Sequence, residues 1–356
     1  MRSRLCSAMT SRRSFLGAAG ATLIAPQLSA CGGADKLPVA SVPDSGFDAD
    51  ATAEQVTEGI DLQGKLAVVT GCTAGIGFET MRVLALRGAN VVGTSRSKKR
   101  AEDACRKVIG RTIPAQLDLG DFDSVARCAD DIHTLRSPID ILINNAGYRG
   151  GGNERQLING VEKHFVINHL GHFILTNRLM DRLYISSQGR IVNVASRAAY
   201  RGAPDDGIRF DDLSMAHEYS DSLAYGQSKL ANVLFSLKLA ELLRGTRITT
   251  NSLHPGVINT DIDRNLNPVT RFGFGLLTAL NGKSIEEGAA TSCYVATSSK
   301  LGNISGRYFE DCEAVTIENK GHMQDLEMAD KLLQASIELT ADWLVEFKAP
   351  TKQDFE

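Results

Sequence analysis

The sequence has few aromatic residues, no lysine-rich block and no pair of cysteines at a metal-binding spacing. Aromatic residues make up 6% of the 356-residue chain, and its formal net charge is −3. That charge, without a lysine-rich block, gives no reason to expect a nucleic acid as partner. Hydrophobic residues at 43% and charged residues at 23% are ordinary for a globular protein. The 33 glycines suit a fold with many tight strand-to-helix turns.

The seven cysteines form no recognisable site. Two of them, Cys6 and Cys31, lie in the first part of the chain, and the other five are scattered with no C-x-x-C pair and no histidine at a zinc-binding spacing. An odd number cannot form a complete set of disulfides. We therefore expect no metal, and small buried apolar roles for most of Cys72, Cys105, Cys128, Cys293 and Cys312.

Residues 1–30 have the pattern of an export signal. Paired arginines, Arg12 and Arg13, precede an apolar run that is too short to remain as a membrane-spanning helix. S-R-R-x-F-L resembles the twin-arginine signal, and "LSAC" resembles a lipobox in which Cys31 would carry a lipid anchor. We expect an exported protein on the periplasmic face of a membrane; a soluble mature form with a free Cys31 thiol would refute the anchor. The alternative is a cytoplasmic protein with a misread start.

Residues 31–53, rich in Gly, Pro, Asp and Ala, are predicted to be a flexible linker. From residue 54 to about 350, short apolar runs alternate with amphipathic helical patterns, with no internal repeat. Such alternation predicts one α/β domain, a doubly wound parallel sheet of about seven strands with helices on both faces. The apolar runs are "KLAVVT", "ANVVGT", "TIPAQLDL", "IDILINNAG", "RIVNVAS" and "RITTNSLHPG".

A glycine cluster, "TGCTAGIG" from Thr70 to Gly77, lies between the first predicted strand and the first helix. Glycines in this position let the backbone turn sharply and approach a pyrophosphate, which then meets the free N–H groups of the helix. The sequence therefore predicts a dinucleotide site of the Rossmann type. Its contacts are expected from Gly71, Thr73, Gly75, Ile76 and Gly77.

The end of the second strand indicates which dinucleotide is bound. NAD-binding folds place an acidic residue there to hold the ribose hydroxyls, whereas this chain has Ser95 and Arg96, followed by further basic residues. An arginine can bind a ribose phosphate with two hydrogen bonds. We therefore predict NADP(H) rather than NAD(H) as the cofactor; the alternative is a solvated basic helix start.

Tyr225 and Lys229 stand four positions apart in "AYGQSKLANVLF". Apolar residues recur there at helical intervals, so both side chains are predicted on one face of a helix. A neighbouring ammonium lowers the pKa of a phenol, which is about 10 for free tyrosine, toward the range where it can exchange protons near neutrality. The alternative is that both side chains are solvent-exposed and have no chemical role. The spacing alone does not distinguish these two interpretations.

Taken in order, the motifs of residues 54–345 resemble those of the short-chain dehydrogenase/reductase superfamily. "NHLGHF", "SKLANVLFSLKLA" and "SGRYFEDC" look most like its retinol-dehydrogenase-like branch. The ordered series comprises the glycine cluster, "LDLGDFDSV", "NNAG", "FVINHLGHFILTNRLM", "RIVNVAS", Tyr225-x-x-x-Lys229 and "HPGVINT".

This resemblance implies a role for each of four catalytic residues. Tyr225 would give a proton to a carbonyl or take one from an alcohol, and Lys229 would bind the nicotinamide ribose and lower the pKa of Tyr225. Ser196 would hold the substrate oxygen, and Asn168 would anchor the water chain that returns protons to Lys229. The cofactor would further be lined by Ser95, Arg96, Asp118, Leu119, Asn144, Ala146, Gly147, Tyr225, Lys229, Pro255, Gly256 and Thr260. Structural roles are expected for His164, His169, His172 and His254.

The resemblance predicts an NADP(H)-dependent oxidoreductase acting on a carbonyl or alcohol. Residues 263–280 would form a lid whose four apolar side chains, Phe272, Phe274, Leu276 and Leu277, suggest a small apolar substrate. Packing in a homo-oligomer or against a membrane is an alternative for this segment. Two other functions stay open, a non-catalytic NADP(H)-binding sensor and a reductase of carbon–carbon double bonds.

Overall fold

The computed structural model describes residues 36–150, 154–258, 282–318 and 321–346. The predicted export signal with Cys31, the lid segment 263–280 and Thr260 lie outside these ranges. Among the helices in the described ranges, none is both long and apolar enough to cross a membrane. The five cysteines of the described chain are all buried free thiols, which confirms the roles expected for them.

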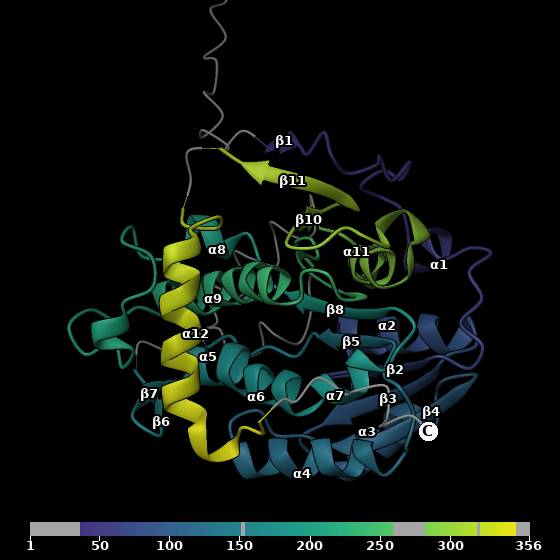
Figure 1. The fold of residues 1–356 in the computed structure, drawn as a ribbon, viewed down its shortest axis with the longest axis horizontal. Helices are drawn as coiled ribbons and strands as arrows, with labels where there is room; N and C mark the ends of the chain where they lie inside the picture. The colour runs from purple at the N-terminus through teal and green to yellow at the C-terminus, as the bar shows by residue number, and fades with distance from the viewer. Residues whose placement is uncertain (1–35, 151–153, 259–281, 319–320, 347–356) are drawn as a thin grey trace, which may run out of the picture. The chain divides into compact units, whose positions relative to one another are not determined.

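A nine-stranded sheet forms the centre of the fold (Figure 1). From one edge to the other, its strands are β4 (Arg111–Gln116), β3 (Asn90–Ser95), β2 (Leu66–Val69), β5 (Ile141–Asn144), β8 (Gly189–Val194), β9 (Ile248–His254), β10 (Tyr308–Glu310), β11 (Glu313–Ile317) and β1 (Lys36–Pro38). A separate hairpin pairs β6 (Leu157–Ile158) with β7 (Val161–Glu162).

The strands from β4 to β10 are all parallel to their neighbours. These seven strands confirm the predicted doubly wound parallel sheet. At the far edge, β11 and β1 are antiparallel additions. β1 is an outermost strand and ends in Pro38, which fits because proline has no N–H to give to a further strand.

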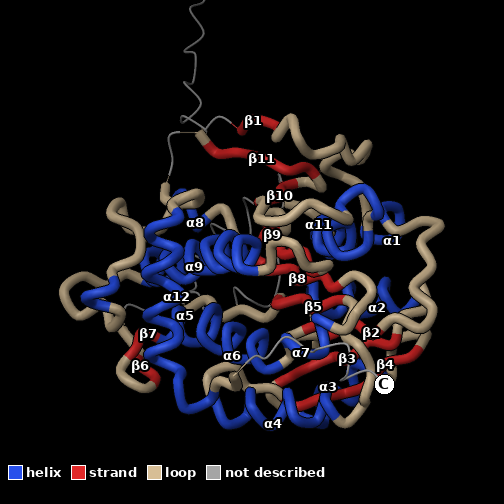
Figure 2. Tube along the Cα trace, in the orientation of Figure 1, coloured by secondary structure: helices blue, strands red, loops and turns tan. Residues whose placement is uncertain are grey.

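Helices cover both faces of the sheet (Figure 2). One face is covered by α4 (Phe122–His133), α5 (Lys163–Phe165), a π-helix (Val166–Leu170), α6 (Gly171–Arg178), α7 (Met180–Tyr184), α8 (Ala198–Arg201), α9 (Asp221–Leu242) and α12 (Leu326–Thr340). The other face is covered by α1 (Ala53–Val56), α2 (Gly75–Leu86), α3 (Lys98–Cys105) and α11 (Ile285–Thr297). Short 3-10 turns occur at Phe210–Asp212, Ser299–Leu301 and Ala341–Trp343.

Successive side chains of the central strands point alternately into two hydrophobic cores, one on each face of the sheet. In β2, the side chain of Val68 enters the core beneath α6 and α9, whereas Ala67 and Val69 enter the core beneath α2 and α11. All three are fully buried, as expected for a parallel strand covered on both faces. Because both faces are apolar, the sheet holds the ends of its strands rigidly, and these ends carry the motifs.

Residues 36–53 pack on the domain, where the composition predicted a flexible linker. β1 pairs with β11, and the amide of Ser45 donates to the Glu313 carboxylate at 2.8 Å. The ring of Phe47 meets Tyr294 edge-on, with ring centroids 5.9 Å apart. This segment therefore covers the β10–β11 end of the sheet rather than acting as a free tether.

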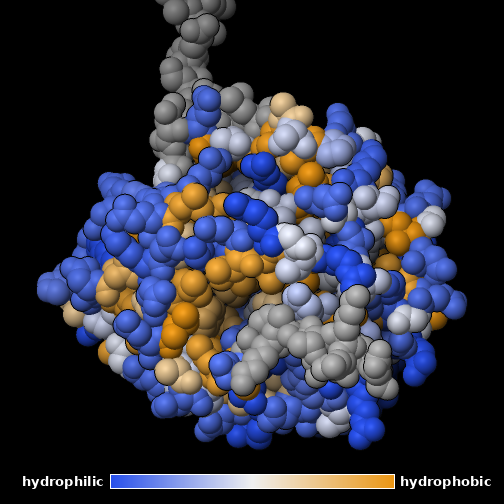
Figure 3. All heavy atoms as spheres, in the orientation of Figure 1, coloured by the Kyte–Doolittle hydropathy of each residue, from blue (hydrophilic) through white to orange (hydrophobic). Residues whose placement is uncertain are grey.

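The helix α12 packs along α9, far from it in sequence. His169 of the π-helix and Ser336 of α12 share a buried hydrogen bond of 2.8 Å. Complete burial lowers the pKa of His169 to about 3, so this ring stays neutral and serves the packing. Figure 3 shows apolar side chains reaching the surface around α9 and α12 on a face that is otherwise largely hydrophilic.

Candidate functional site

The predicted motifs meet at the carboxyl ends of the strands, because neighbouring parallel strands all end on the same side of the sheet. The loop after β2 begins at Thr70, the loop after β5 at Asn145, and the loop after β8 contains Ser196. β2 lies between β3 and β5: the chain runs from β2 through β3 to β4 on one side, and then crosses back to β5 on the other. Ligands of open α/β sheets bind outside the carboxyl ends of the strands at such a switch point.

The glycine cluster after β2 has no room for larger residues. Gly71 has φ +73, and a Cβ there would come within 2.9 Å of Ala146 Cβ. A Cβ on Gly77 would collide with the carbonyl of Gly71 and with the Asn145 amide. Helix α2 starts at Gly75 with no side chain capping its first N–H groups. These N–H groups and the close-lying backbone suit the binding of an anion.

A buried hydrogen-bond network joins the glycine cluster to the loop after β5. Thr70 Oγ1 accepts from the amides of Asn145 and Ala146, both at 2.9 Å. It also bonds to His172 Nε2 at 2.9 Å, and the other ring nitrogen of His172 bonds to the backbone oxygen of Asn168 at 3.1 Å. Burial lowers the pKa of His172 to about 4. Its neutral ring therefore ties Thr70 to the helical segment that carries Asn168.

At the end of β3, Ser95 is half-buried and Arg96 is exposed. The Ser95 hydroxyl accepts from the amide of Ser97, which caps α3. The nearby lysines are engaged elsewhere: Lys98 donates to the Pro114 carbonyl at 2.6 Å, and Lys99 pairs with Asp103 at 3.6 Å. Arg96 is thus the basic side chain placed directly at the strand end.

Helix α9 carries Tyr225 and Lys229. It begins after Ser220, whose hydroxyl accepts from the Leu223 amide at 3.2 Å, and it runs through 22 residues. Lys229 is 2% exposed, and its Nζ donates to the Val194 carbonyl of β8 at 2.9 Å. The ammonium lies 5.8 Å from the centre of the Tyr225 ring. Burial lowers the pKa of Lys229 to about 8, so the solvent-exposed alternative fails for this residue.

Ser196 lies two residues after Val194 and is half-buried, with its hydroxyl accepting from the Ala198 amide at 3.2 Å. The next residue, Arg197, bonds to the buried carboxylate of Glu310 at 2.9 Å. The same carboxylate accepts from Tyr200 and Tyr308 at 2.9 and 3.1 Å. This cluster ties the loop that carries Ser196 to β10.

Asn168 is fully buried in the π-helix. Helices of this type are rare in proteins, and those that occur are often found at functional sites. Its Oδ1 accepts from the Tyr148 amide at 2.6 Å, and its Nδ2 donates to the Tyr148 carbonyl and to Ser228. The Ser228 hydroxyl in turn donates to the Tyr225 carbonyl at 2.8 Å. Asn168 thus connects the loop after β5 to the helix that carries Tyr225.

The remaining predicted residues occupy different environments. Asn144 is 1% exposed and donates to Thr176 and Asn193, so its side chain belongs to the buried scaffold beneath the loop after β5. Ala146 is half-buried and Gly147 exposed on the loop above it. The half-buried positions include Thr73, Ile76, Asp118, Pro255 and Gly256, whereas Leu119 is buried.

Asn145 and Glu162 had no assigned role in the sequence reasoning, and His164 and His172 had only structural ones. Thr70 and Asn145 join the loops after β2 and β5. His172 bonds to Thr70, and Glu162 bonds to His164. The repeated asparagine of "NNAG" offered a clue for Asn145. In the described ranges, no group of His, Cys, Asp and Glu residues could hold a metal ion.

Comparisons with known proteins agree with this geometry. The family model for short chain dehydrogenases matches residues 65–206. Short-chain dehydrogenase TIC 32 A, chloroplastic, from Brassica napus is 40% identical over 310 residues, which cover 83% of this chain and 94% of that protein. Retinol dehydrogenase 12 from Homo sapiens is 38% identical over 288 residues, covering 79% of this chain and 87% of that protein.

The fold is also similar to solved structures. The crystal structure of an uncharacterized protein from Mycobacterium Paratuberculosis matches with a TM-score of 0.64 and 31% sequence identity. The match covers 82% of this chain and 98% of the other. The similarity therefore extends well beyond the residues matched by the family model.

Proposed function

The chain belongs to the short-chain dehydrogenase/reductase family, with retinol-dehydrogenase-like relatives, and we propose that it is an NADP(H)-dependent oxidoreductase. It transfers a hydride between the nicotinamide and a carbonyl or alcohol group of a small apolar substrate. The observation that carries this proposal is the buried ammonium of Lys229 beside the ring of Tyr225, at the carboxyl edge of the sheet.

The loops after β2 and β5 suit a dinucleotide of the kind that this family binds. Close backbone approach at Gly71 and Gly77 and the uncapped start of α2 favour a pyrophosphate. The loop of Ala146 and Gly147 stands beside them and would line the rest of the cofactor. Nicotinamide, when bound, supplies the hydride chemistry, and the protein supplies position and field.

The acid–base chemistry is assigned to four side chains. Tyr225 Oη gives a proton to the substrate oxygen during reduction, or takes one during oxidation. The Ser196 hydroxyl orients that oxygen by a hydrogen bond. Lys229, held by the Val194 carbonyl, favours the charged form of the phenol because opposite charges stabilise each other in a desolvated site. Asn168 is proposed to anchor the returning water chain while it holds the loop after β5.

A screen of aldehydes, ketones and enones with NADPH tests the proposed activity. We expect oxidation of NADPH by apolar aldehydes or ketones, with retinoid-like compounds among the first to include because of the relatives' names. Turnover of enones alone, with loss of the carbon–carbon double bond, would instead identify a double-bond reductase. Tight NADPH binding with no turnover of any class would favour a sensor.

The cofactor preference is expected to depend on Arg96. The wild-type protein should bind NADPH more tightly than NADH, and Arg96→Ala should weaken NADPH binding about tenfold through loss of a charged hydrogen bond. NADH binding should be unchanged, because it lacks the ribose phosphate. Lys99→Ala is the control, since Lys99 is 80% exposed in its side chain and pairs with Asp103. A wild-type preference for NADH in fluorescence titrations would refute this assignment.

A further inference from the structure

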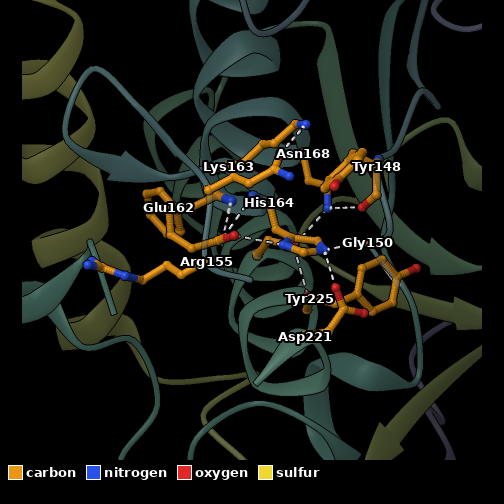
Figure 4. Close-up of polar contacts among 12 residues, drawn as sticks. Tyr148, Gly150, Arg155, Glu162, Lys163, His164, Asn168, Asp221 and Tyr225 are labelled. Atoms are coloured by element: carbon orange, nitrogen blue, oxygen red, sulfur yellow. Dashed lines mark hydrogen bonds and ion pairs between the residues drawn. The ribbon is translucent and has the colours of Figure 1, made fainter. Parts of the chain in front are cut away.

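A buried acid–imidazole pair, Glu162 and His164, lies next to the proposed catalytic residues (Figure 4). Each is 1% exposed. Glu162 Oε1 accepts from His164 Nδ1 at 2.8 Å, and Glu162 Oε2 accepts from the amides of His164 and Phe165 at 2.8 and 3.3 Å. The carboxylate thus fixes both the short helix α5 and the orientation of the imidazole ring.

The other ring nitrogen holds the loop after β5. The buried amide of Gly150 donates to His164 Nε2 at 2.9 Å. Because Nδ1 carries the proton that Glu162 accepts, Nε2 offers a lone pair, and the neutral ring is satisfied on both sides. Two residues earlier, Tyr148 is clamped by the Asn168 side chain. The loop is therefore fixed at Tyr148 and Gly150, on either side of Arg149.

Asp221 offers a second partner to the same nitrogen. Its Oδ1 lies 3.4 Å from His164 Nε2, one helical turn before Tyr225 on α9. In Figure 4, the His164 ring lies between Glu162 on one side and Gly150 and Asp221 on the other. A proton on Nε2 cannot coexist with the hydrogen bond from the Gly150 amide, and it would face the Asp221 carboxylate instead. The His164 ring can thus have either of two partners at Nε2: the Gly150 amide when the ring is neutral, or the Asp221 carboxylate when Nε2 carries a proton.

These contacts reach the phenol itself. The rings of His164 and Tyr225 meet edge-on, with centroids 6.2 Å apart. The Arg149 guanidinium, on the loop between the two clamped residues, lies 5.2 Å from the centre of the Tyr225 ring. A displacement of residues 148–150 therefore changes the surroundings of the proposed proton donor.

We propose that His164 is a positioning residue whose neutral imidazole holds the Gly150 amide and thereby the 148–150 loop against Tyr225. Protonation of Nε2 exchanges this contact for Asp221 and releases the loop. The inference rests on the proposed function for its effect on turnover. The ionisable groups around the ring come from β7, α5, the loop and the start of α9, and they are Glu162, Lys163, Tyr148, Arg149, Tyr219, Asp221 and Tyr225.

Two substitutions of His164 by an amide residue test the contacts of the two ring nitrogens separately. His164→Asn keeps a donor for Glu162 but removes the acceptor for Gly150. His164→Gln places an amide oxygen near the position of Nε2 and keeps that acceptor. We expect kcat for His164→Asn to fall about tenfold, the size of one lost hydrogen bond to a buried group, with His164→Gln near wild type. NADPH affinity should stay within about twofold for both, because Thr70 holds the cofactor end of the loop.

Hydrogen exchange at the Gly150 amide measures its hydrogen bond to His164 Nε2 independently of enzymatic activity. We expect strong protection in the wild type and in His164→Gln, and loss of protection in His164→Asn. In the wild type, protection factors and kcat should both fall as the pH is lowered, because a proton on Nε2 removes the acceptor for the Gly150 amide. His164→Gln, which cannot take up that proton, should lose much less of either.

The outcomes distinguish this inference from the proposed function. Equal kcat and equal Gly150 protection in the two variants would overturn the positioning role. Wild-type protection that does not fall as the pH is lowered would overturn the protonation step, even if neither variant folded. A wild-type protein that reduces no carbonyl and oxidises no alcohol would instead count against the proposed function, and the exchange measurements would still decide the role of His164.

Discussion

Tyr225→Phe is expected to lower kcat by at least about 1,000-fold, the range over which a lost general acid usually acts. The substitution removes the Oη proton but keeps the ring and its packing against His164 and Arg149. NADPH affinity should therefore stay within about twofold, since the phosphate-binding backbone around Gly71 is untouched. Steady-state rates with the best carbonyl substrate and a fluorescence titration of NADPH measure the two quantities.

Tyr219→Phe provides the matched control. Tyr219 is a half-buried phenol just before the same helix, and burial raises its pKa to about 12. Such a phenol is poorly suited to exchange protons near neutrality, so its loss should leave kcat close to wild type. A Tyr225→Phe variant that keeps more than a tenth of wild-type turnover, or a Tyr219→Phe variant that loses as much as Tyr225→Phe, would contradict the assignment of the acid–base group.

The general location of the site followed from sequence because it depends on topology. Parallel strands place their carboxyl ends at one edge, so motifs that directly follow strands must meet there. The Tyr225 and Lys229 spacing needed one further assumption, a helix, and residues 221–242 form it. The seven parallel strands and the buried free cysteines were also predictable, since continuous apolar runs and isolated cysteines leave few other arrangements.

Contacts between segments distant in the chain were not predictable. β1 pairs with a strand near residue 317, and its sequence, interrupted by proline, carries no strand pattern. His164 and His172 are both buried and were assigned structural roles. Their partners, Gly150 and Thr70, come from other segments. No spacing in the sequence predicts which histidine lies beside the phenol, because that depends on how α5 packs against α9.

Replacing the buried ammonium is expected to stabilise the fold while removing activity. Burial lowers the pKa of Lys229 from 10.5 to about 8, so below pH 8 the folded state carries a desolvated charge that the unfolded state does not. The shift corresponds to about 3 kcal/mol against folding. Lys229→Met removes the charge and keeps the chain length. The Val194 carbonyl retains a partner, because Asn232 donates to it at 3.2 Å.

At pH 7 and without added cofactor, Lys229→Met should therefore raise the free energy of unfolding by about 1–3 kcal/mol, and turnover should be lost. The sign follows from proton binding: between about pH 8 and 10.5 the unfolded wild-type chain binds the proton that the folded chain has released, so wild-type stability rises with pH. The gap between the two proteins should consequently close toward pH 10.5, as followed by urea denaturation across this range.

Lys238→Met on the same helix should behave in the opposite way. Lys238 pairs with Glu241 at 2.9 Å and with Asp330, and these partners raise its pKa. Its contribution to stability is therefore present at neutral pH and is lost as the pH rises, so its removal should destabilise the fold slightly at pH 7. If Lys229→Met instead destabilised the protein as Lys238→Met does, the ammonium of Lys229 would be a stabilising structural group. Its burial beside Tyr225 would then no longer indicate a charge held in place for chemistry.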